Sequence, residues 1–351
     1  MYQIAVIGGD GVGPEVIREG IKVLNAVAKV EKLKYELHSY DIGGERFLKS
    51  NELIPDSVMN ELKKMNAIYF GAIGRPDIQP GILERGILLK LRFDLDQYIN
   101  LRPIKLYDER FCPLKNKKPE DIDMVVVREN TEGPYVGMGG IFKKNTPDEI
   151  AIQEDVNTRK GIERCIRYAF EYTKKRNKRK QLTLCDKSNV LTYGHDLWQR
   201  TFKDVGKEYS NITQNHVLVD ALTMFFIRNP ENYDVIVTNN MFGDIITDLG
   251  AMIQGGMGVA ASGNINPEGV SMFEPVHGSA PQYAGKNVAN PIAAIAALSM
   301  LLDSLGETKS AQRVEKAISK LIKESHLKTL DLSEDPGTSG IGDLIAKFAI
   351  L

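Results

Sequence analysis

The sequence predicts an α/β fold that comprises two domains or one large unit. Strand-like apolar runs alternate with segments of helical periodicity along most of the chain, which is the pattern of α/β proteins. A chain of 351 residues is longer than most chains that fold around one small hydrophobic core. A glycine-rich turn follows the first predicted strand directly, and a predicted helix follows that turn.

The first elements are a strand at 4–8, IAVIG, the turn GGDGVG at 8–13 and a helix over 15–30. Pro14 suits the first turn of that helix. The dinucleotide fingerprint Gly-x-Gly-x-x-Gly fails here, because a pattern that starts at Gly9 meets Pro14 where the third glycine is required. We therefore predict a tight strand-to-helix connection beside a cleft rather than a Rossmann-type phosphate cradle.

The following elements are predicted by the same patterns. NAIYFGAIG at 66–74 is a second strand with a glycine after it, and 81–99 has helical periodicity. NLRP ends this helix, because the residue before a proline avoids the α region. A second group of strands lies at 123–130, 181–187, 215–221 and 233–240, with a long helix at 161–176. After about 255 come a glycine-rich loop, the turn-rich segment 273–291, an apolar helix and a charged final helix.

Composition excludes several classes of partner. The net charge of -1 gives no overall attraction for nucleic acid or anionic membranes, and the longest apolar stretch, 292–302, is too short to span a bilayer. The basic run KKRNKRK at 174–180 is interpreted as a solvated helix end. No signal sequence is recognised. The three cysteines lack metal or disulfide spacing, so we expect each of them to be a small core residue of a protein in a reducing cytoplasm.

Charged side chains are predicted at the carboxyl ends of the second group of strands. Ligands gather at these ends in α/β sheets. The four runs carry groups of both signs there, which indicates a binding site rather than an ordinary surface. The groups are Arg128, Asp186 with Lys187, Asp220, and the pair Asp244 and Asp248.

Three of these carboxylates predict a metal site. Asp244 and Asp248 are four residues apart at the start of a helix, so their side chains share one face. With Asp220 they would form an oxygen site that suits Mg²⁺ or Mn²⁺ better than zinc. Because clustered carboxylates repel one another, we expect a metal, Lys187 or an arginine to balance them.

Arginines and leucines predict a site for a dicarboxylate. The planar fork of arginine binds carboxylates through two hydrogen bonds, and Arg92, Arg102 and Arg128 are the candidates. Leu88 and Leu89 lie about one helical turn before Arg92, which permits an apolar substrate arm beside a bound carboxylate.

Tyr135 and Lys187 are the candidate proton-transfer groups. Tyr135 lies seven residues after Arg128 in a glycine-rich loop, and Lys187 follows a predicted strand. Together they offer a proton donor and a proton acceptor, provided that burial adjusts their pKa values.

These motifs resemble those of the β-decarboxylating dehydrogenases, the isocitrate and isopropylmalate dehydrogenase family. The likeness runs from GGDGVGPE to the last helix and is nearest to bacterial members that act on 3-isopropylmalate in leucine biosynthesis. Many motifs in the same order make this resemblance specific. The matching blocks are LKLRFDLDQYINLRP, VVVRENTEGPY, LCDKSNVL, VIVTNNMFGDIITDLGAMIQGGMGVAASGNI and FEPVHGSAPQYAGKNVANP.

The resemblance implies a fold that differs from the Rossmann type, in agreement with the failed glycine fingerprint. It implies a large cofactor-binding domain from 1–99 and 256–351. It also implies a small domain from 100–255 that carries substrate, metal and dimer contacts and gives an arm to a dimer partner. The resemblance also implies a homodimer with shared active sites, in which Lys187 and Asp220 reach the other subunit's site. It does not decide whether two dimers form a tetramer.

The resemblance further implies NAD-dependent oxidative decarboxylation of 3-isopropylmalate to 4-methyl-2-oxopentanoate and CO₂. Lys187 is then the base, Tyr135 the acid, and Asp220, Asp244 and Asp248 hold Mg²⁺ or Mn²⁺. The substrate carboxylates bind Arg92, Arg102 and Arg128, and the isopropyl pocket is lined by Leu88, Leu89 and Val190. The cofactor site comprises Glu274, His277, Gly278, Ser279, Ala280, Gln282, Tyr283 and Asn290.

Other activities in the family stay open from the sequence. Tartrate or D-malate oxidation is the nearest alternative. For those substrates we would expect a bulky aromatic residue before Arg92, where this chain has Arg85 and Gly86. Isocitrate or homoisocitrate would require polar contacts at Leu88 and Leu89. An inactive regulatory subunit would lack a metal aspartate or the lysine, and this chain has all of them.

The predicted cofactor is NAD rather than NADP. Gln282 stands where NAD-using relatives usually carry an aspartate for the ribose hydroxyls, and Tyr283 matches NADP-dependent isocitrate dehydrogenases. However, a 2′-phosphate normally requires a cationic partner, and Lys286 is the only nearby candidate. The segment LDLSEDPGTSGIGD at 330–343, expected near the adenine, has four acidic residues and no lysine or arginine.

Overall fold

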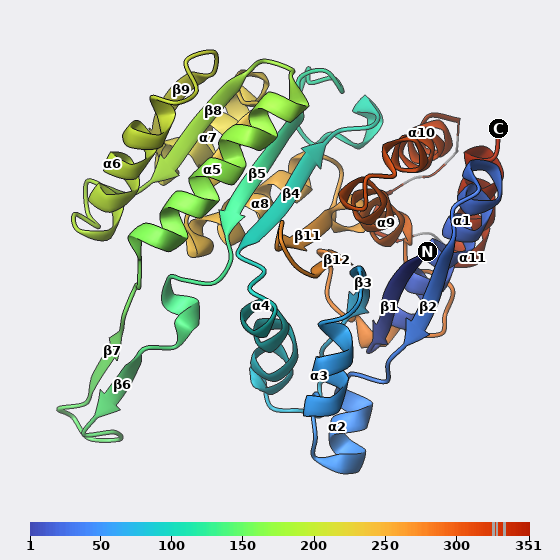
Figure 1. Cartoon of the computed structure of the whole chain (residues 1–351), viewed down its shortest axis with the longest axis horizontal. Coiled ribbons are helices and arrows are strands. Elements are labelled where there is room, and N and C mark those ends of the chain that lie inside the picture. The colour runs from blue at the N-terminus through green and yellow to red at the C-terminus, as the bar shows by residue number, and fades with distance from the viewer. Residues whose placement is uncertain (325–326, 328, 333–334) are drawn as a thin grey trace. The chain divides into compact units, whose positions relative to one another are not determined.

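The computed structural model has two compact units, each built from helices and mostly parallel strands (Figure 1). It describes residues 1–324, 327, 329–332 and 335–351, so Ser333 and Glu334 of the predicted adenine segment lie outside the described residues. Unit 1 comprises Met1–Gln97, Arg102–Ile122 and Ala251–Leu351. Unit 2 comprises Tyr98–Leu101 and Asp123–Gly250. The predicted α/β class is confirmed, whereas residues 102–122, expected in the small domain, cluster with unit 1.

The strands of unit 1 follow the order β2-β1-β3-β12-β11. All neighbours are parallel except β11 and β12, which are antiparallel. Every residue of β3 is buried, as expected for a parallel strand that helices cover on both faces. The strands are β1 (Tyr2–Gly9), β2 (Tyr35–Ser39), β3 (Ala67–Ala72), β11 (Ala261–Ile265) and β12 (Ser271–Pro275).

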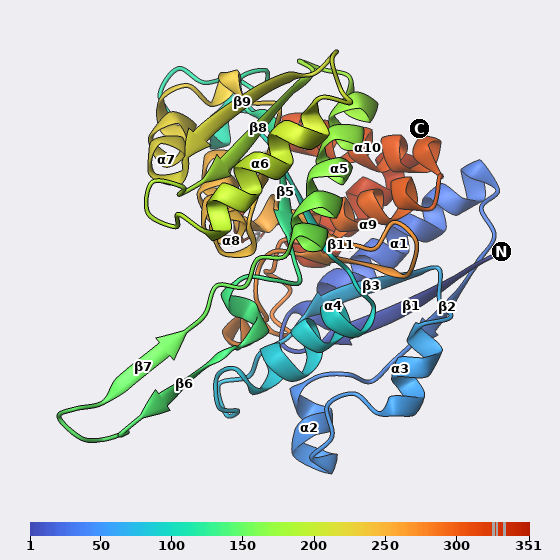
Figure 2. The same ribbon diagram turned by 60° about the vertical axis from the view of Figure 1, so that its left-hand side comes forward.

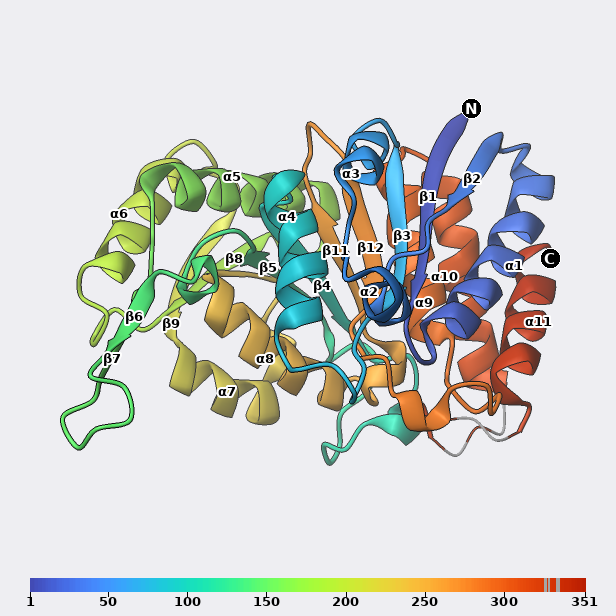
Figure 3. The same ribbon diagram turned by 90° about the horizontal axis from the view of Figure 1, so that it is seen from below.

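Helices cover both faces of the unit 1 strands (Figure 3). α1 and α9 pack on β1, β3, β11 and β12, and α10 and α11 pack outside them. On the other face a core cluster joins β1 and β3 to α3 and α4 through side chains such as Phe70, Leu62 and Leu91. The helices are α1 (Gly13–Glu31), α2 (Gly44–Ser50), α3 (Asp56–Leu62), α4 (Lys90–Asp94), α9 (Ile292–Ser304), α10 (Thr308–Glu324) and α11 (Gly337–Ala349).

The helix predicted over 81–99 is shorter and less regular than expected. It begins with a π-helical segment, η1 (Glu84–Leu89), and continues as α4. Gly86 lies within η1, and a Cβ atom there would meet Leu53 Cδ1 at 2.1 Å, so glycine permits this close packing. A π turn changes the phase of the side chains, which a plain 3.6-residue pattern does not predict.

The strands of unit 2 follow the order β5-β10-β8-β9 and are all parallel. Thr238 of β10 pairs in register with Arg128 of β5 and with Cys185 of β8, so their carboxyl ends lie at one level. The strands are β5 (Asp123–Glu129), β8 (Gln181–Asp186), β9 (Thr213–Leu218) and β10 (Val235–Thr238). A further strand, β4 (Ile99–Lys105), has residues in both units.

The helices of unit 2 lie on the two faces of these strands, with α5 and α6 on one face and α7 and α8 on the other (Figure 3). The predicted helix at 161–176 is confirmed and begins two residues earlier, because Thr158 Oγ1 accepts the Gly161 N–H at 3.0 Å and caps it. The helices are α5 (Arg159–Arg176), α6 (Gly194–Gly206), α7 (Val219–Arg228) and α8 (Asn240–Ile253).

A two-stranded antiparallel arm, β6 (Gly139–Phe142) and β7 (Ile150–Gln153), projects from unit 2 (Figures 1 and 2). Its apolar side chains are exposed, for example Phe142 at 63% and Ile152 at 56%. The arm itself therefore has the form that the resemblance implies, and its docking on a dimer partner stays a prediction.

The basic run at 174–180 ends α5, and part of it is paired rather than solvated. Arg176 contacts Asp234 Oδ1 and Asp123 Oδ1 at 2.7 Å each, and Lys178 also pairs with Asp123. Cys165 and Cys185 are buried as predicted, whereas Cys112 is half-buried. Among the residues described, no helix combines the length and apolarity that a membrane crossing requires.

Candidate active site

The predicted site residues fall into groups within each unit. In unit 2 the main group forms around Arg128, near the end of β5, whose side chain is only 1% exposed. Its Nε and Nη2 donate to Asn240 Oδ1 at 3.0 and 2.7 Å, and its Nη1 donates to Asp244 Oδ1 at 2.5 Å. Asn240 is a site residue that the sequence analysis missed. Its only sequence signal is its position as the last residue of VIVTNN, two residues after β10 ends.

Tyr135 completes this group. It lies in a short 3₁₀ turn, η3 (Pro134–Val136), after Gly133, whose φ of 75° favours glycine. The Tyr135 hydroxyl donates to Asp244 Oδ2 at 2.8 Å, and the Arg128 guanidinium lies 5.3 Å from the centre of the Tyr135 ring. The Asp244 carboxylate therefore joins the predicted proton donor to a predicted substrate arginine.

Lys187 and Asp220 form a second pair in unit 2. Lys187 Nζ donates to Asp220 Oδ1 at 2.7 Å. This hydrogen bond lowers the pKa of Asp220 below its ordinary value. The Asp220 side chain is 62% exposed and lies in the first turn of α7, where a negative charge also suits the helix dipole.

The three aspartates predicted to hold a metal do not form a cluster within this chain. Asp244 contacts Arg128 and Tyr135, Asp220 contacts Lys187, and Asp248 is exposed on α8 four residues after Asp244. No group of three His, Cys, Asp or Glu side chains suited to a metal occurs among the described residues. Their oxygen donors suit Mg²⁺ or Mn²⁺, but the expected three-carboxylate group is not assembled by one chain alone.

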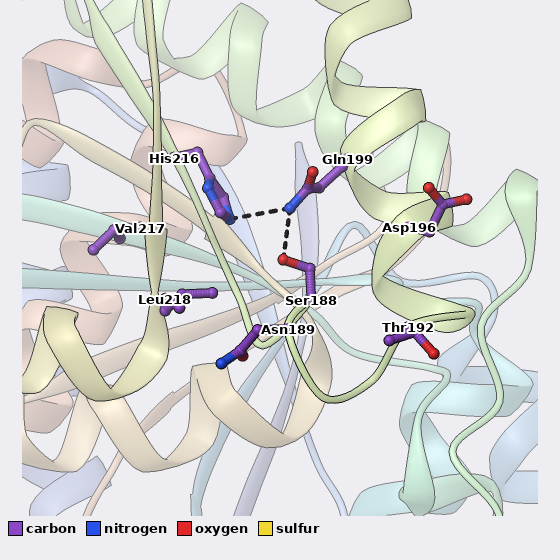
Figure 4. A pocket seen from close by; sticks show the side chains of 8 residues that line it. All are labelled: Ser188, Asn189, Thr192, Asp196, Gln199, His216, Val217 and Leu218. Atoms are coloured by element: carbon purple, nitrogen blue, oxygen red, sulfur yellow. Dashed lines mark hydrogen bonds between the residues drawn. The ribbon is translucent and has the colours of Figure 1, made fainter.

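The segment around Lys187 is held by polar contacts that the sequence did not reveal. Asp186 is 1% exposed, and its carboxylate accepts the Ser188 N–H at 3.0 Å and contacts His216 Nε2 at 2.9 Å. Gln199 Nε2 donates to Ser188 Oγ at 2.6 Å (Figure 4). Ser188, Gln199 and His216 line an open pocket of about 640 Å³ together with Asn189, Thr192, Asp196, Val217 and Leu218. Val190, predicted to line an apolar pocket, is 63% exposed in this chain.

In unit 1, Arg92 and Glu274 form a buried pair. Arg92 Nη2 lies 3.5 Å from Glu274 Oε1, and Asn264 Nδ2 donates to the same oxygen at 2.7 Å. Among the described residues, Arg92 Nε has no hydrogen-bond partner, so it retains a donor for a ligand. Arg102 is also buried, at 8% exposure. Leu88 and Leu89 are half-buried beside the fully buried Ile87 and Leu91.

A cavity of about 300 Å³ in unit 1 brings together most of the predicted cofactor residues. His277 Nδ1 lies 3.0 Å from the Gly278 carbonyl, and burial lowers the pKa of His277, which favours the neutral ring. Its buried Nε2 is then an acceptor, and it has no partner in the described part of the chain. The lining residues are Val12, Met257, Gly258, His277, Gly278, Ala280, Tyr283, Ala289, Asn290, Asp331 and Leu332.

Three predicted cofactor residues do not line this cavity. Glu274 is paired with Arg92, and Gln282 is exposed on a 3₁₀ turn, η6 (Pro281–Tyr283). Ser279 supports the cavity from behind, because its hydroxyl donates to the Gly74 carbonyl at 2.7 Å and its carbonyl accepts the Val12 N–H at 2.8 Å.

The glycine turn after β1 joins loops instead of forming a fingerprint. Gly11 has φ of +59°, and a Cβ atom there would lie 2.0 Å from the Ser279 carbonyl oxygen. The buried Asp10 carboxylate accepts the Gly44 N–H at 2.9 Å and the Gly74 N–H at 3.2 Å. The predicted tight connection is therefore confirmed, and the turn lies against the segment that carries Ser279.

Comparisons with known proteins agree with the order of these motifs. Residues 3–345 match the family described as isocitrate/isopropylmalate dehydrogenase. The chain is 52% identical to a 3-isopropylmalate dehydrogenase of Thermobifida fusca, over 92% of this chain and 91% of that protein. It is 50% identical to one of Corynebacterium glutamicum, over 98% of each. The crystal structure of an isocitrate dehydrogenase from Methylococcus capsulatus is similar with a TM-score of 0.89, at 33% identity over all of both chains.

Proposed function

The chain belongs to the isocitrate/isopropylmalate dehydrogenase family, and from this premise we propose that it oxidatively decarboxylates 3-isopropylmalate with NAD. The product is 4-methyl-2-oxopentanoate, an intermediate of leucine biosynthesis in the cytoplasm. The relatives from Thermobifida fusca and Corynebacterium glutamicum support this choice of substrate through their names and about half-identical sequences.

The main observation that supports the proposal is that the Asp244 carboxylate binds two predicted site residues at once. One oxygen accepts from Arg128 and the other from Tyr135, so a carboxylate-binding cation and a proton donor are fixed beside each other. A buried arginine held next to a phenolic acid suits a reaction on a carboxylate substrate that removes CO₂ and then protonates carbon.

The proposed reaction needs a base first and an acid last. Lys187 accepts the proton of the 2-hydroxyl group, and hydride leaves carbon 2. The bond to the 3-carboxylate then breaks, its electrons move toward the 2-keto oxygen, and CO₂ leaves. Tyr135 donates a proton to carbon 3 of the resulting enol. When bound, NAD accepts the hydride and a divalent cation polarises the oxygen on carbon 2.

Lys187 must lose its proton before it acts as this base. In this chain its Nζ is hydrogen-bonded to Asp220. A cation held by Asp220 would compete with Lys187 for the same carboxylate. We assign Asp220, Asp244 and Asp248 to that cation, with Asp220 supplied by the partner subunit, because one chain does not assemble the three carboxylates.

Substrate recognition is assigned to the arginines and apolar side chains that the family resemblance implies. Arg92, with its available Nε, Arg102 and Arg128 are proposed to bind the two carboxylates. Leu88 and Leu89, half-buried next to a turn of π-helix, and the exposed Val190 are proposed to contact the isopropyl group.

The cavity beside Val12 is proposed to bind the adenosine half of NAD. Apolar side chains such as Ala289 and Leu332 suit a flat ring, and His277 Nε2 offers an acceptor for a ligand hydroxyl or amine. Asp331 adds a carboxylate to the lining, which disfavours a 2′-phosphate. This charge supports NAD over NADP even though Gln282 carries none.

A homodimer with shared sites follows from the same proposal. The exposed apolar arm of β6 and β7 and the exposed Met224 and Ile227 of α7 offer surfaces that a second copy would cover. In such a dimer, Lys187 and Asp220 are proposed to act at the partner's site.

The experiment that tests this proposal measures the stoichiometry of the reaction. The purified enzyme, given 3-isopropylmalate, NAD and Mn²⁺, should release one NADH and one CO₂ for each substrate molecule consumed. Lys187→Ala should abolish both. NADH without CO₂ would contradict decarboxylation, and no reaction would contradict the proposed substrate.

A further inference from the structure

His195 is a buried histidine that the proposed reaction does not use. It is the second residue of α6 and has 0% exposure. Burial lowers its pKa, which favours the neutral ring. The Lys187 backbone N–H donates to His195 Nδ1 at 2.8 Å, so the ring proton resides on Nε2.

The main chain of Lys187 is hydrogen-bonded on both sides. Its carbonyl accepts the N–H groups of Val190 and Leu191 at 3.0 and 2.9 Å, and its own N–H has the imidazole of His195 as acceptor. The next N–H, that of Ser188, donates to the Asp186 carboxylate. These contacts hold the Lys187 backbone in place at the end of β8.

The same imidazole also contacts the start of α8, the helix that carries Asp244. The His195 and Phe242 rings pack edge to face with centres 5.5 Å apart. Asn239, whose Oδ1 caps α8 by accepting the Phe242 N–H at 3.0 Å, lies next to the same ring. His195 therefore lies between the Lys187 segment and the first turn of α8.

We propose that His195 is a positioning residue that holds the Lys187 backbone at a fixed position relative to α8, the helix that carries Asp244. This inference rests on the proposed role of Lys187 as the base. Proton transfer requires close alignment of donor and acceptor, and a displacement of about 1 Å can cost about a hundredfold in rate. Loss of the His195 acceptor should therefore lower kcat while leaving the affinity for substrate nearly unchanged.

The experiment compares two side chains of equal shape that differ in one acceptor. Asn at position 195 can offer Oδ1 near the site of Nδ1, whereas Leu offers no acceptor. We expect His195→Leu to lower kcat about a hundredfold with little change in KM, and His195→Asn to restore most of the loss. Trp198→Phe is the control, because it removes a buried hydrogen bond to Asn157 from the same helix without touching Lys187. It should keep kcat near that of the wild type.

Hydrogen exchange of the Lys187 amide gives a readout that does not depend on turnover. Mass spectrometry should find this amide protected in the wild type and in His195→Asn, and unprotected in His195→Leu. Equal kcat values for the wild type and His195→Leu would overturn the inference. So would an Asn variant with less than about a tenth of the wild-type kcat, a result that decides the case even if the Leu variant does not fold.

The proposed function and this inference fail in different ways. A wild-type enzyme that leaves 3-isopropylmalate unchanged, or a fully active Lys187→Ala variant, would refute the proposed function. An active wild type whose Lys187 amide exchanges freely would refute only the role of His195.

Discussion

Tyr135 shows how a single side chain links structure to the proposed chemistry. Its hydroxyl donates to Asp244 Oδ2, so its orientation is already fixed by a carboxylate that also holds Arg128. Tyr135 is the central residue of a short turn that begins after a glycine with positive φ. Removing the hydroxyl oxygen of Tyr135 therefore tests the proton-donating group while the ring keeps its position.

Tyr135→Phe should fold normally and slow the steps after hydride transfer. The ring remains, but no proton is available for carbon 3, so kcat should fall by about a hundredfold or more. Stopped-flow absorbance should record a rapid burst of NADH followed by slow turnover. A variant with wild-type steady-state rate would show that another group is the acid.

Gln282 is the residue that departs most clearly from the expected cofactor pattern. It is exposed on η6, next to Tyr283 of the proposed adenosine cavity. Gln282→Asp adds a charge that accepts hydrogen bonds from ribose hydroxyls and repels a 2′-phosphate, so the NAD-to-NADP ratio of kcat/KM should rise. Gln282→Asn is the uncharged control. An unchanged ratio in the Asp variant would place position 282 outside the cofactor site.

At the scale of elements, the turn between β1 and α1 connects the loops beside the proposed cofactor cavity of unit 1. Asp10 accepts N–H groups from Gly44, at the start of α2, and from Gly74, in the loop after β3. Gly74 in turn accepts from the Ser279 hydroxyl. One buried carboxylate thus connects two loops to the turn that contacts Ser279, in the proposed cofactor segment.

Asp10→Ala should destabilise this unit and weaken NAD binding together. A buried N–H group and a partly buried one would lose their carboxylate acceptor, and the free energy of unfolding should fall by about 2 kcal/mol or more. Urea denaturation measures the first effect, and the KM for NAD the second. Asp10→Asn keeps one acceptor oxygen and should lose less; equal stability of all three proteins would contradict the role of Asp10.

The sequence predicted elements better than contacts, for physical reasons that particular residues show. The strand ends that carry Arg128 and Asp186 were predictable, because parallel strands with adjacent register bring them to one edge. The π-helical turn before Arg92 was not, since it depends on Leu53 packing against Gly86. Asn240 and His195 were missed because only the folded chain reveals which donors face them.

At the scale of the whole molecule, the account requires two copies of the chain. One chain pairs Lys187 with Asp220 and, separately, Tyr135 with Asp244, and its described residues do not gather the three aspartates. The proposed completion of the site by a partner subunit would explain why a single chain carries the required groups without assembling them.

Mixed dimers test this sharing of sites. Lys187→Ala and Tyr135→Phe homodimers should both be nearly inactive. When the two are unfolded together and refolded as a one-to-one mixture, half of the dimers are mixed, and each has one intact site, so about a quarter of wild-type activity should return. No recovery would show that Lys187 and Tyr135 act within the same chain.

The measurement that tests the central claim most directly is a comparison of substrates for the wild-type enzyme. Steady-state kcat/KM should be determined for 3-isopropylmalate, isocitrate, homoisocitrate, D-malate and tartrate, each with NAD and with NADP. The account predicts the highest value for 3-isopropylmalate with NAD, because burying an isopropyl group against Leu88 and Leu89 contributes about 0.8 kcal/mol per methylene. A higher kcat/KM for any other substrate in this panel, or for NADP, would contradict it.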